Sequence, residues 1–405
     1  MQYHALALAV NAGEVDLIGL EGAPVHQALT AEPRVHCHRL PDRGYRSRER
    51  RGRGWFLLLS AVRNLGLGLR LLSTLLRVPR PDLILVQTPP ASPTLPVAWL
   101  AARLRGARLV VDWHNLAHTV LAVKTGTDHR AVKALRRSER RWARRADGHL
   151  AVSAALAEWL SREAGVTAVV LHDRPPAFFA RPDPADAATL WTKLAAEHRL
   201  GPRRLPLVVC PTSWTPDEDF DLLLEALERT ERRLAERLGP GDASAPSMAV
   251  ILTGRGPMRP AFEARVARRP FVHVAVRTAW LEPAAYPVLV GSADLGLCLH
   301  RSSSGLDLPM KLADFRGAGV AVATFDYAPV LAEVLTPGHE GVTFNDPAGL
   351  TAILTGLAAG DFVGIPRLAA ARQWLVANPP RRWEEEWRER QSQILGLKID
   401  CRFGD

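Results

Sequence analysis

Residues 293–326 read ADLGLCLHRSSSGLDLPMKLADFRGAGVAVATFD. An apolar run ends at Leu299, a turn rich in serine and glycine follows, and a helix is predicted to begin near Pro309. A second apolar run, GVAVATFD, comes after that helix. Because strand, helix and strand in this order are typical of a parallel βαβ unit, the segment predicts an α/β fold.

The same alternation extends along the chain. Apolar runs predict further strands at 14–20, 81–88, 107–114 and 146–153, and again at 205–213, 248–256 and 271–278. A helix is predicted over Phe220–Leu238, because the acidic residues 217–219 before it suit a helix N-terminus. With 405 residues, of which 47% are hydrophobic, the chain can fill two cores of ordinary size. Two similar α/β halves are therefore expected.

Composition also predicts where the halves meet. Residues 178–206 are rich in proline and charge and predict a linker, with the boundary between residues 175 and 205. We predict a first domain over 1–185, a second over 186–375, and a C-terminal segment, 376–405, whose helix crosses back to the first domain. The stretch 239–247 has only small and turn-forming residues and predicts a surface insertion.

The charge balance limits the partners that the chain is expected to bind. Lysine and arginine number 52 against 42 for aspartate and glutamate, a surplus of 10. Such an excess favours phosphate-bearing substrates, an anionic membrane surface or nucleic acid. No recognisable nucleic-acid-binding module accompanies it, so we expect no nucleic-acid partner. The four cysteines show no CxxC spacing, which suggests no zinc site and favours a reducing, cytosol-facing location.

Two predicted helices are rich in cations. Residues 55–77 are long enough to span a bilayer but contain Arg63 and Arg70, which with Arg77 recur every seven residues. This pattern indicates a helix lying against a membrane or packed on a sheet. The helix 130–145 holds eight Lys and Arg residues, which either form a solvated face or attract anionic lipid or a pyrophosphate acceptor. The residues that we predict for acceptor or membrane contacts are Arg63, Arg70, Arg137 and Arg141.

The serine-rich turn is the main candidate for phosphate binding. Its small side chains and backbone amides stand at the end of a predicted strand, where α/β sheets bind pyrophosphate. Lys311 and Asp314 follow three residues apart, so they share a helix face. The lysine suits a phosphate, and the aspartate suits ribose hydroxyls. A plain serine-rich turn beside an exposed helical pair is the alternative. The donor-binding residues predicted here are Ser302, Ser303, Ser304, Gly305, Lys311 and Asp314.

Two further clusters end predicted strands. Gly254, Arg255 and Gly256 follow MAVILT, where the arginine can contact a phosphate, although a βα turn also explains the glycines. Asp112 and His114 follow RLVV, where an imidazole and a carboxylate can take a proton from an acceptor hydroxyl. A histidine satisfied by local hydrogen bonds is the alternative there. We predict His114 as the base, with Asp112 as its orienter or substitute.

Six segments together resemble one known family. They are VVDWHN (110–115), HDRPPAFF (172–179), TSWTPDEDFDLLLEALE (212–228), LTGRGPMR (252–259), WLEPAAYPVLVGSADLGLCLHRSSSGLDLPMKLADF (280–315) and GVTFND (341–346). From Met1 to about residue 390 the chain is similar to the chitobiosyldiphosphodolichol β-mannosyltransferase family. The resemblance implies a GT-B fold, in which two Rossmann-like doubly wound domains face a cleft.

The resemblance also implies an activity and a setting. The expected enzyme transfers mannose with inversion from GDP-mannose to dolichyl-pyrophosphate-linked chitobiose, an early step of N-glycan precursor assembly. It is expected to need no cofactor and no metal, since no carboxylate pair of the DxD kind stands at a strand end. The implied location is the cytosolic face of the endoplasmic reticulum membrane, with other early mannosyltransferases as partners.

Carried over by position, the resemblance assigns roles to single residues. Asp314 stands where an acid usually holds the ribose, Asp307 is expected nearer the sugar, and Trp214 of the TSWT motif joins the donor-binding set. Ser213 and Glu218 occupy the places at which related retaining enzymes have an Arg and a Lys. Arg255, Lys311 and backbone amides are therefore expected to neutralise the diphosphate.

The start of the chain departs from the family pattern. Family members normally have a membrane anchor, a first strand and a glycine loop before the sequence that corresponds to MQYHALAL. We therefore expect a truncated sequence whose first domain lacks its first strand. The alternative functions are a GT-B transferase with another nucleotide sugar or lipid acceptor, and an inactive membrane-associated scaffold.

Overall fold

The computed structural model describes residues 1–22, 25–41, 53–201, 203–239, 246–327, 329–336, 338–359 and 366–395. These residues form two compact units. Unit 1 comprises Met1–His172 and the segment from Glu384, and unit 2 comprises Asp173–Trp383. The chain therefore passes between the units twice, whereas the composition predicts these passages at residues 185 and 375.

Unit 2 is built on one parallel sheet. Its strands are β7 (Leu207–Pro211), β8 (Met248–Thr253), β9 (Val274–Ala279), β10 (Leu295–Cys298), β11 (Val322–Phe325) and β12 (Gly341–Phe344). The order across the sheet is β12-β11-β10-β7-β8-β9, and every neighbouring pair is parallel. This is the doubly wound Rossmann order, in which the direction of winding reverses between β7 and β10. The five predicted strands of this half are confirmed, and β12 is an addition.

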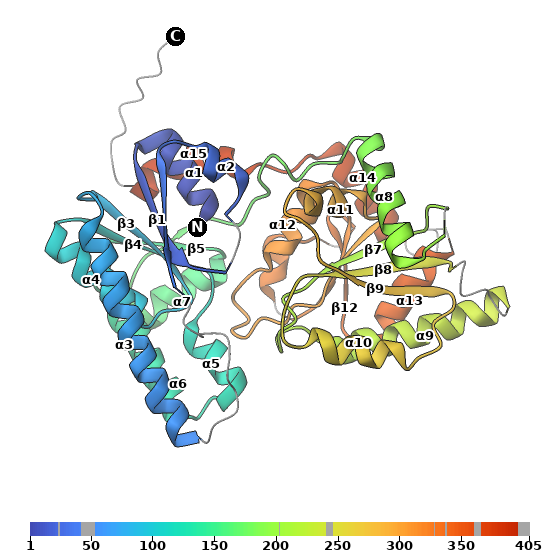
Figure 1. The fold of residues 1–405 in the computed structure, drawn as a ribbon, viewed down its shortest axis with the longest axis horizontal. Helices are drawn as coiled ribbons and strands as arrows, with labels where there is room; N and C mark the ends of the chain where they lie inside the picture. The colour runs from blue at the N-terminus through green and yellow to red at the C-terminus, as the bar shows by residue number, and fades with distance from the viewer. Residues whose placement is uncertain are drawn as a thin grey trace, which may run out of the picture. The chain divides into compact units, whose positions relative to one another are not determined.

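Helices cover both faces of that sheet. They are α8 (Pro184–His198), α9 (Phe220–Leu238), α10 (Arg259–Ala267), α11 (Ala285–Ser292), α12 (Met310–Gly317), α13 (Pro347–Ala358) and α14 (Pro366–Ala377), with a short 3₁₀ helix η1 (Pro329–Glu333). In Figure 1, α9, α10 and α13 lie on one side of the sheet, and α8, α11 and α12 on the other. Leu223 and Leu227 of α9 pack with Val250 and Leu297 of the strands in a fully buried core.

The predicted linker contains a helix. Residues 178–206 include α8, which begins after Asp183, and the carboxylate of Asp183 accepts a hydrogen bond from the N–H of Ala185 at 2.8 Å. Pro184 stands at the first helical position, where its missing N–H costs nothing. The prediction of a linker here was wrong, because the proline and the acids that suggested irregular structure start the helix. Most of the predicted insertion at 239–247 lies outside the described residues.

Unit 1 contains two separate parallel sheets. β1 (Val15–Leu20) pairs with β2 (Val35–Leu40), and β3 (Leu83–Thr88), β4 (Arg108–Trp113), β5 (Gly148–Ala151) and β6 (Val169–Val170) pair in chain order. The four strands predicted for this half are confirmed as β1, β3, β4 and β5. Val110 and Val111 of β4 are buried, so this strand lies in the middle of its core.

The helices of unit 1 include both predicted cationic helices. They are α1 (Gln2–Ala12), α2 (Gln27–Ala31), α3 (Arg53–Arg77), α4 (Thr94–Arg105), α5 (Ala117–Thr125), α6 (Arg130–Ala143), α7 (Ala154–Ala164) and α15 (Trp383–Leu395). α3 packs against α4, and α6 packs against α4 and α5. None of the described helices combines the length and the apolar content that a membrane span needs.

Candidate active site

The candidate donor site lies at the carboxyl end of the sheet in unit 2. β7 and β10 are neighbours, and the chain leaves them in opposite directions, toward β8 and toward β11. α/β sheets bind ligands where the winding reverses in this way. The loop 212–219 follows β7 and the segment 299–309 follows β10, and the backbones of Glu218 and His300 form an isolated β-bridge between them. The two loops therefore meet at the switch point.

Glu218 binds one of these loops to α12. Glu218 is 2% exposed, and its carboxylate accepts hydrogen bonds from the backbone N–H groups of Ser213 and Trp214, both at 2.9 Å. It also forms an ion pair with the ammonium of Lys311. Burial by itself would lower the pKa of Lys311, but the charge and the hydrogen bond of Glu218, together with smaller contributions from Cys298 and Cys210, raise it. Lys311, which was predicted to contact the donor phosphate, is thus a cation held in place by a carboxylate of the protein.

His300 forms a second connection between the loops. Its Nδ1 lies 3.2 Å from Oδ2 of Asp217 and its Nε2 lies 3.0 Å from Oδ2 of Asp307. Burial would lower the pKa of His300, but the hydrogen bonds to both carboxylates outweigh it and raise the pKa to about 10. The imidazole is therefore a cation at neutral pH. Sequence reasoning missed His300 and Asp217, although His300 follows the end of β10 almost directly.

The serine-rich turn is organised around Asp307, which is buried. The hydroxyls of Ser302 and Ser304 both donate to Oδ1 of Asp307, the second at 3.3 Å. The backbone N–H groups of Ser304 and Gly305 in turn donate to Ser302 Oγ, at 3.3 and 2.8 Å. Tyr327 donates to the backbone carbonyl of Asp307 at 2.8 Å. These hydroxyls and amides, predicted to be open for phosphate, therefore make hydrogen bonds inside the turn.

The glycines after β8 permit close contact with the loop after β7. Gly254 has a φ of +107°, and a Cβ placed there would lie 1.9 Å from the carbonyl oxygen of Thr212. A Cβ on Gly256 would lie 2.0 Å from the carbonyl oxygen of Ser213. Both positions thus require glycine for packing between the two loops. Arg255, between them, places its guanidinium over the ring of Trp280, 3.9 Å from the centroid.

Trp214 and Asp314 are more buried than the sequence suggests. The indole of Trp214 is 0% exposed, stacks on Phe220 with centroids 4.7 Å apart, and donates to the carbonyl of Gly254 at 3.2 Å. Its side chain is part of the core, so we remove it from the predicted donor contacts. Asp314 accepts a hydrogen bond from the Tyr286 hydroxyl at 3.3 Å. Burial raises the pKa of Asp314 to about 8, so its carboxyl is mostly protonated at neutral pH.

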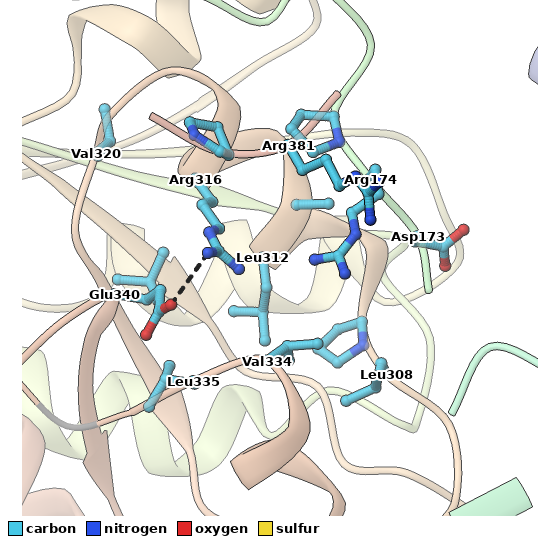
Figure 2. A pocket seen from close by; sticks show the side chains of 15 residues that line it. Asp173, Arg174, Leu308, Leu312, Arg316, Val320, Val334, Leu335, Glu340 and Arg381 are labelled. Carbon is cyan, nitrogen blue, oxygen red and sulfur yellow. Dashed lines mark ion pairs between the residues drawn. The ribbon is translucent and has the colours of Figure 1, made fainter. Parts of the chain in front are cut away.

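A pocket beside α12 contains none of these predicted donor residues in its described lining. Leu308 and Leu312 form part of its apolar wall, and the guanidinium of Arg316 reaches Glu340 at 3.3 Å (Figure 2). Arg174 and Arg381 belong to the lining as well and are labelled in the same view. Asp173 also lines the pocket, and its negative charge contributes to the raised pKa of Asp314. This part of the pocket is therefore close to Asp314, the carboxyl group that is predicted to bind the ribose.

The predicted base in unit 1 belongs to a larger cluster. Nε2 of His114 lies 2.8 Å from Oδ2 of Asp112, and Nε2 of His4 lies 3.2 Å from the same oxygen. The indole N–H of Trp387, on α15, donates to Nδ1 of His4 at 3.1 Å. Burial would raise the pKa of Asp112, but the two histidines outweigh burial and hold it well below its usual range. Asp112 is thus a buried carboxylate that orients two imidazoles, and His4 was missed from the sequence.

The cationic helices carry the remaining predicted residues. Arg137 and Arg141 are exposed on α6, and no ion pair is recorded for either within the described residues. Glu139, between them in sequence, is buried and accepts hydrogen bonds from the N–H groups of Ala117 and His118, at 2.7 and 3.2 Å. Arg63 and Arg70 are half-buried on α3. Within the described residues, no three His, Cys, Asp or Glu side chains are placed to hold a metal ion.

Known proteins match the chain in sequence and in fold. The family model "Glycosyl transferase 4-like domain" matches residues 2–177. "Chitobiosyldiphosphodolichol beta-mannosyltransferase" of Mus musculus is 33% identical, over 98% of this chain and 86% of its own length. "UDP-glycosyltransferase TURAN" of Arabidopsis thaliana is 35% identical, over 96% of this chain and 92% of its own length. The crystal structure of Anabaena Alr3699/HepE in complex with UDP and glucose superposes with a TM-score of 0.65 at 14% identity, covering 95% of this chain and 100% of that one.

The sheet order and the structural match give the chain the GT-B fold, and the named relatives make it a glycosyltransferase. The expected fold class is confirmed. The identity of 33% to the mouse relative, over 98% of this chain, then shows the family: the chain belongs to the chitobiosyldiphosphodolichol β-mannosyltransferases.

Proposed function

We propose that this enzyme transfers mannose from GDP-mannose to dolichyl-pyrophosphate-linked chitobiose with inversion, as an early step of N-glycan precursor assembly. The observation that carries the proposal is the identity of 33% to a relative of that name over 98% of the chain. The cationic groups at the switch point of unit 2 support a diphosphate donor, and no cofactor is part of the proposal.

The donor would be held by residues of unit 2. Lys311 and Arg255 supply positive charge for the diphosphate, and the His300 imidazolium adds to the local positive potential. One well-placed protein group that stabilises the charge on the leaving diphosphate contributes roughly 10²- to 10³-fold to the rate. The protonated carboxyl of Asp314 can donate to a ribose hydroxyl, while Asp307 keeps the serine-rich turn in shape for the sugar.

The acceptor would be activated by the cluster of unit 1. Its 4-hydroxyl attacks the anomeric carbon of mannose while the bond from that carbon to the GDP oxygen breaks on the opposite face. His114 takes the hydroxyl proton, and GDP leaves with the electron pair of the broken bond. Since Nε2 of His114 engages Asp112, the proton goes to Nδ1 in this proposal, and Asp112 stabilises the imidazolium that forms.

The setting in the cell follows from a lipid-linked acceptor. We place the enzyme on the cytosolic face of the endoplasmic reticulum membrane, together with other early mannosyltransferases. Arg137 and Arg141 of α6 are exposed cations that suit the pyrophosphate of the acceptor or anionic lipid. Arg63 and Arg70 of α3 suit the membrane surface in the same way.

A second candidate differs only in the donor. The Arabidopsis relative, at 35% identity, is named a UDP-glycosyltransferase, so UDP-sugars are the first alternative. A panel of GDP- and UDP-sugars with lipid-linked chitobiose separates the two. Mannosyl transfer from GDP-mannose alone is the expected result, and turnover with a UDP-sugar would replace the donor in the proposal. Donor binding without turnover in any combination would favour a scaffold.

The proposed donor site is tested by two substitutions. Lys311→Ala and Asp314→Ala are expected to lose mannosyl transfer, as measured by product formation. Because Lys311→Ala also leaves the buried carboxylate of Glu218 without its partner, its activity is compared at a temperature at which circular dichroism shows the variant folded. Lys193→Ala, which removes an exposed cation paired with Glu197 on α8, is the control and should keep full activity. Full activity in both site variants would refute the site.

A further inference from the structure

One carboxylate oxygen in unit 1 binds two imidazoles. Oδ2 of Asp112 lies 2.8 Å from Nε2 of His114 and 3.2 Å from Nε2 of His4. Both imidazoles use the same ring nitrogen on the same acceptor, so these contacts by themselves do not separate the roles of the two histidines. The contacts of the other ring nitrogen, Nδ1, make the difference.

A tryptophan of α15 occupies Nδ1 of His4. The indole N–H of Trp387 donates to this nitrogen at 3.1 Å, and both side chains lie in the interior, Trp387 at 0% and His4 at 3% exposure. An indole nitrogen can only donate a hydrogen bond, so Nδ1 of His4 must be the acceptor and carries no proton. The proton of the neutral ring is then on Nε2, from which it donates to Asp112.

This hydrogen bond keeps His4 neutral. A proton added to its Nδ1 would point at the indole N–H, so protonation would break a buried hydrogen bond and leave two donors facing each other. The side chain of His114 is 19% exposed, against 4% for His4, and the proposed reaction delivers the acceptor proton to Nδ1 of His114. His4 therefore acts as a neutral donor to Asp112 and does not compete with His114 for the proton.

We propose that Trp387 is a positioning residue, whose indole N–H fixes the tautomer of His4 and so leaves His114 as the histidine of this cluster that takes the acceptor proton. The inference rests on the proposed function, because it deepens the role given there to His114. With His4 neutral, the negative charge of Asp112 is available to the imidazolium that forms on His114. A cationic His4 would already have neutralised that charge and would repel a second cation.

Other charged groups belong to the elements that meet at this cluster. The terminal ammonium of Met1 donates to the amide oxygen of Gln87 at 3.3 Å, and Glu386 of α15 pairs with Arg390 at 3.3 Å. Trp387→Phe keeps all of these groups and removes only the indole N–H and part of the ring. A change in the titration of the buried histidine in this variant therefore reports the lost hydrogen bond.

Nitrogen-15 NMR of the histidine rings in the full chain tests the tautomer without donor or acceptor, with His4→Gln to assign the signals. In the wild type we expect His4 to remain the neutral Nε2–H tautomer over the whole pH range in which His114 takes up its proton. In Trp387→Phe we expect His4 to titrate as well, so that the two rings share one proton. Proton uptake by His4 in the wild type, or an Nδ1–H tautomer, would overturn the proposal.

Transfer kinetics test the consequence for the reaction. Trp387→Phe should lower kcat on the acid side of the pH profile by roughly twofold or more, because a second ring competes for the proton, while the donor KM stays the same. Adding His4→Gln to this variant should restore the wild-type profile, since glutamine can donate from the place of Nε2 but cannot take up a proton. A profile that stays altered in the double variant would overturn the positioning role.

A matched control accounts for the smaller ring. Trp99→Phe makes the same change in unit 1, at an indole whose buried nitrogen has no recorded hydrogen bond to the described residues, and it should keep the wild-type profile. Normal turnover in His114→Ala together with loss of turnover in His4→Gln would make His4 the base and overturn the proposal. The expected tautomers in a wild type that transfers no sugar would instead reject the proposed function and confirm the hydrogen bond that fixes His4.

Discussion

Lys311 on α12 and Glu218, in the loop before α9, form an ion pair in which the carboxylate is almost completely buried. The same carboxylate holds the backbone amides of Ser213 and Trp214, so one side chain joins α12 to the loop after β7. The cation predicted for the donor diphosphate is therefore positioned by a residue that the donor itself need not touch.

Glu218→Gln should destabilise unit 2 strongly. The variant leaves the Lys311 charge without its carboxylate, and breaking a buried pair from one side costs on the order of 3 kcal/mol. The free energy of unfolding in urea measures the loss. Glu225→Gln is the control, since its exposed pair with Arg229 should contribute less than about 0.5 kcal/mol. Losses of equal size in the two variants would contradict a structural role for the buried pair.

His300→Gln should change how stability depends on pH. The pKa of His300 in the folded protein is raised to about 10, above an unfolded value near 6.5. Its contribution to stability is therefore complete below about pH 6.5 and is lost as the pH rises toward 10. The difference in unfolding free energy between wild type and variant should shrink steadily over that range. A difference that stays constant from neutral to alkaline pH would show that the imidazole is not held as a cation.

Gly254→Ala should cost more stability than φ strain alone explains. At Gly254 a methyl group would collide with the carbonyl of Thr212, and the cost should be roughly 3 kcal/mol or more. Gly239 also has a positive φ but no atom within contact range of its Cβ, so Gly239→Ala isolates the strain, about 1 kcal/mol. Thermal melts of the two variants make the comparison. Similar melting temperatures would mean that the loops after β7 and β8 can move apart cheaply.

His114→Ala should reduce turnover more than donor binding. Loss of a general base typically costs about 10²- to 10⁴-fold in rate, whereas the Michaelis constant for the donor should change little. Steady-state kinetics with GDP-mannose and lipid-linked chitobiose separate the two effects. His36→Ala, which removes an exposed histidine paired with Glu14, should behave like the wild type. Normal turnover in His114→Ala would move the base elsewhere, with His4 as the next residue to replace.

Local sequence patterns predict the fold of unit 2 well. β7, β8 and β10 are continuous apolar runs, and the ends of α9 are marked by Asp219, which caps the first turn at 2.9 Å from the N–H of Leu222, and by Gly239. β12 was missed because its four residues begin with glycine, which gives too short an apolar run. In the same way, polar composition concealed α8, whose first turn is built from the residues that suggested a linker.

The candidate site was harder to predict, since its contacts join distant parts of the chain. The ends of β4, β8 and β10 could be found as places for chemistry. Sequence patterns do not tell whether a polar group faces a ligand or another residue. Asp307, the hydroxyls of Ser302 and Ser304, and Lys311 all have partners within the protein. His4 lies next to Asp112 only because α1 and β4 meet in the folded unit, and neither residue has a local pattern that points to the other.

The tie between Trp387 and His4 has a consequence for synthesis. Unit 1 is not a continuous stretch of chain, because α15 belongs to it but follows unit 2 in the sequence. The hydrogen bond from Trp387 to His4 can therefore form only after unit 2 has left the ribosome. The carboxylate of Asp112 and its two histidines can come together early, yet the indole that fixes one of those histidines arrives last. The proposed proton-transfer cluster is therefore completed only after unit 2 has been synthesised.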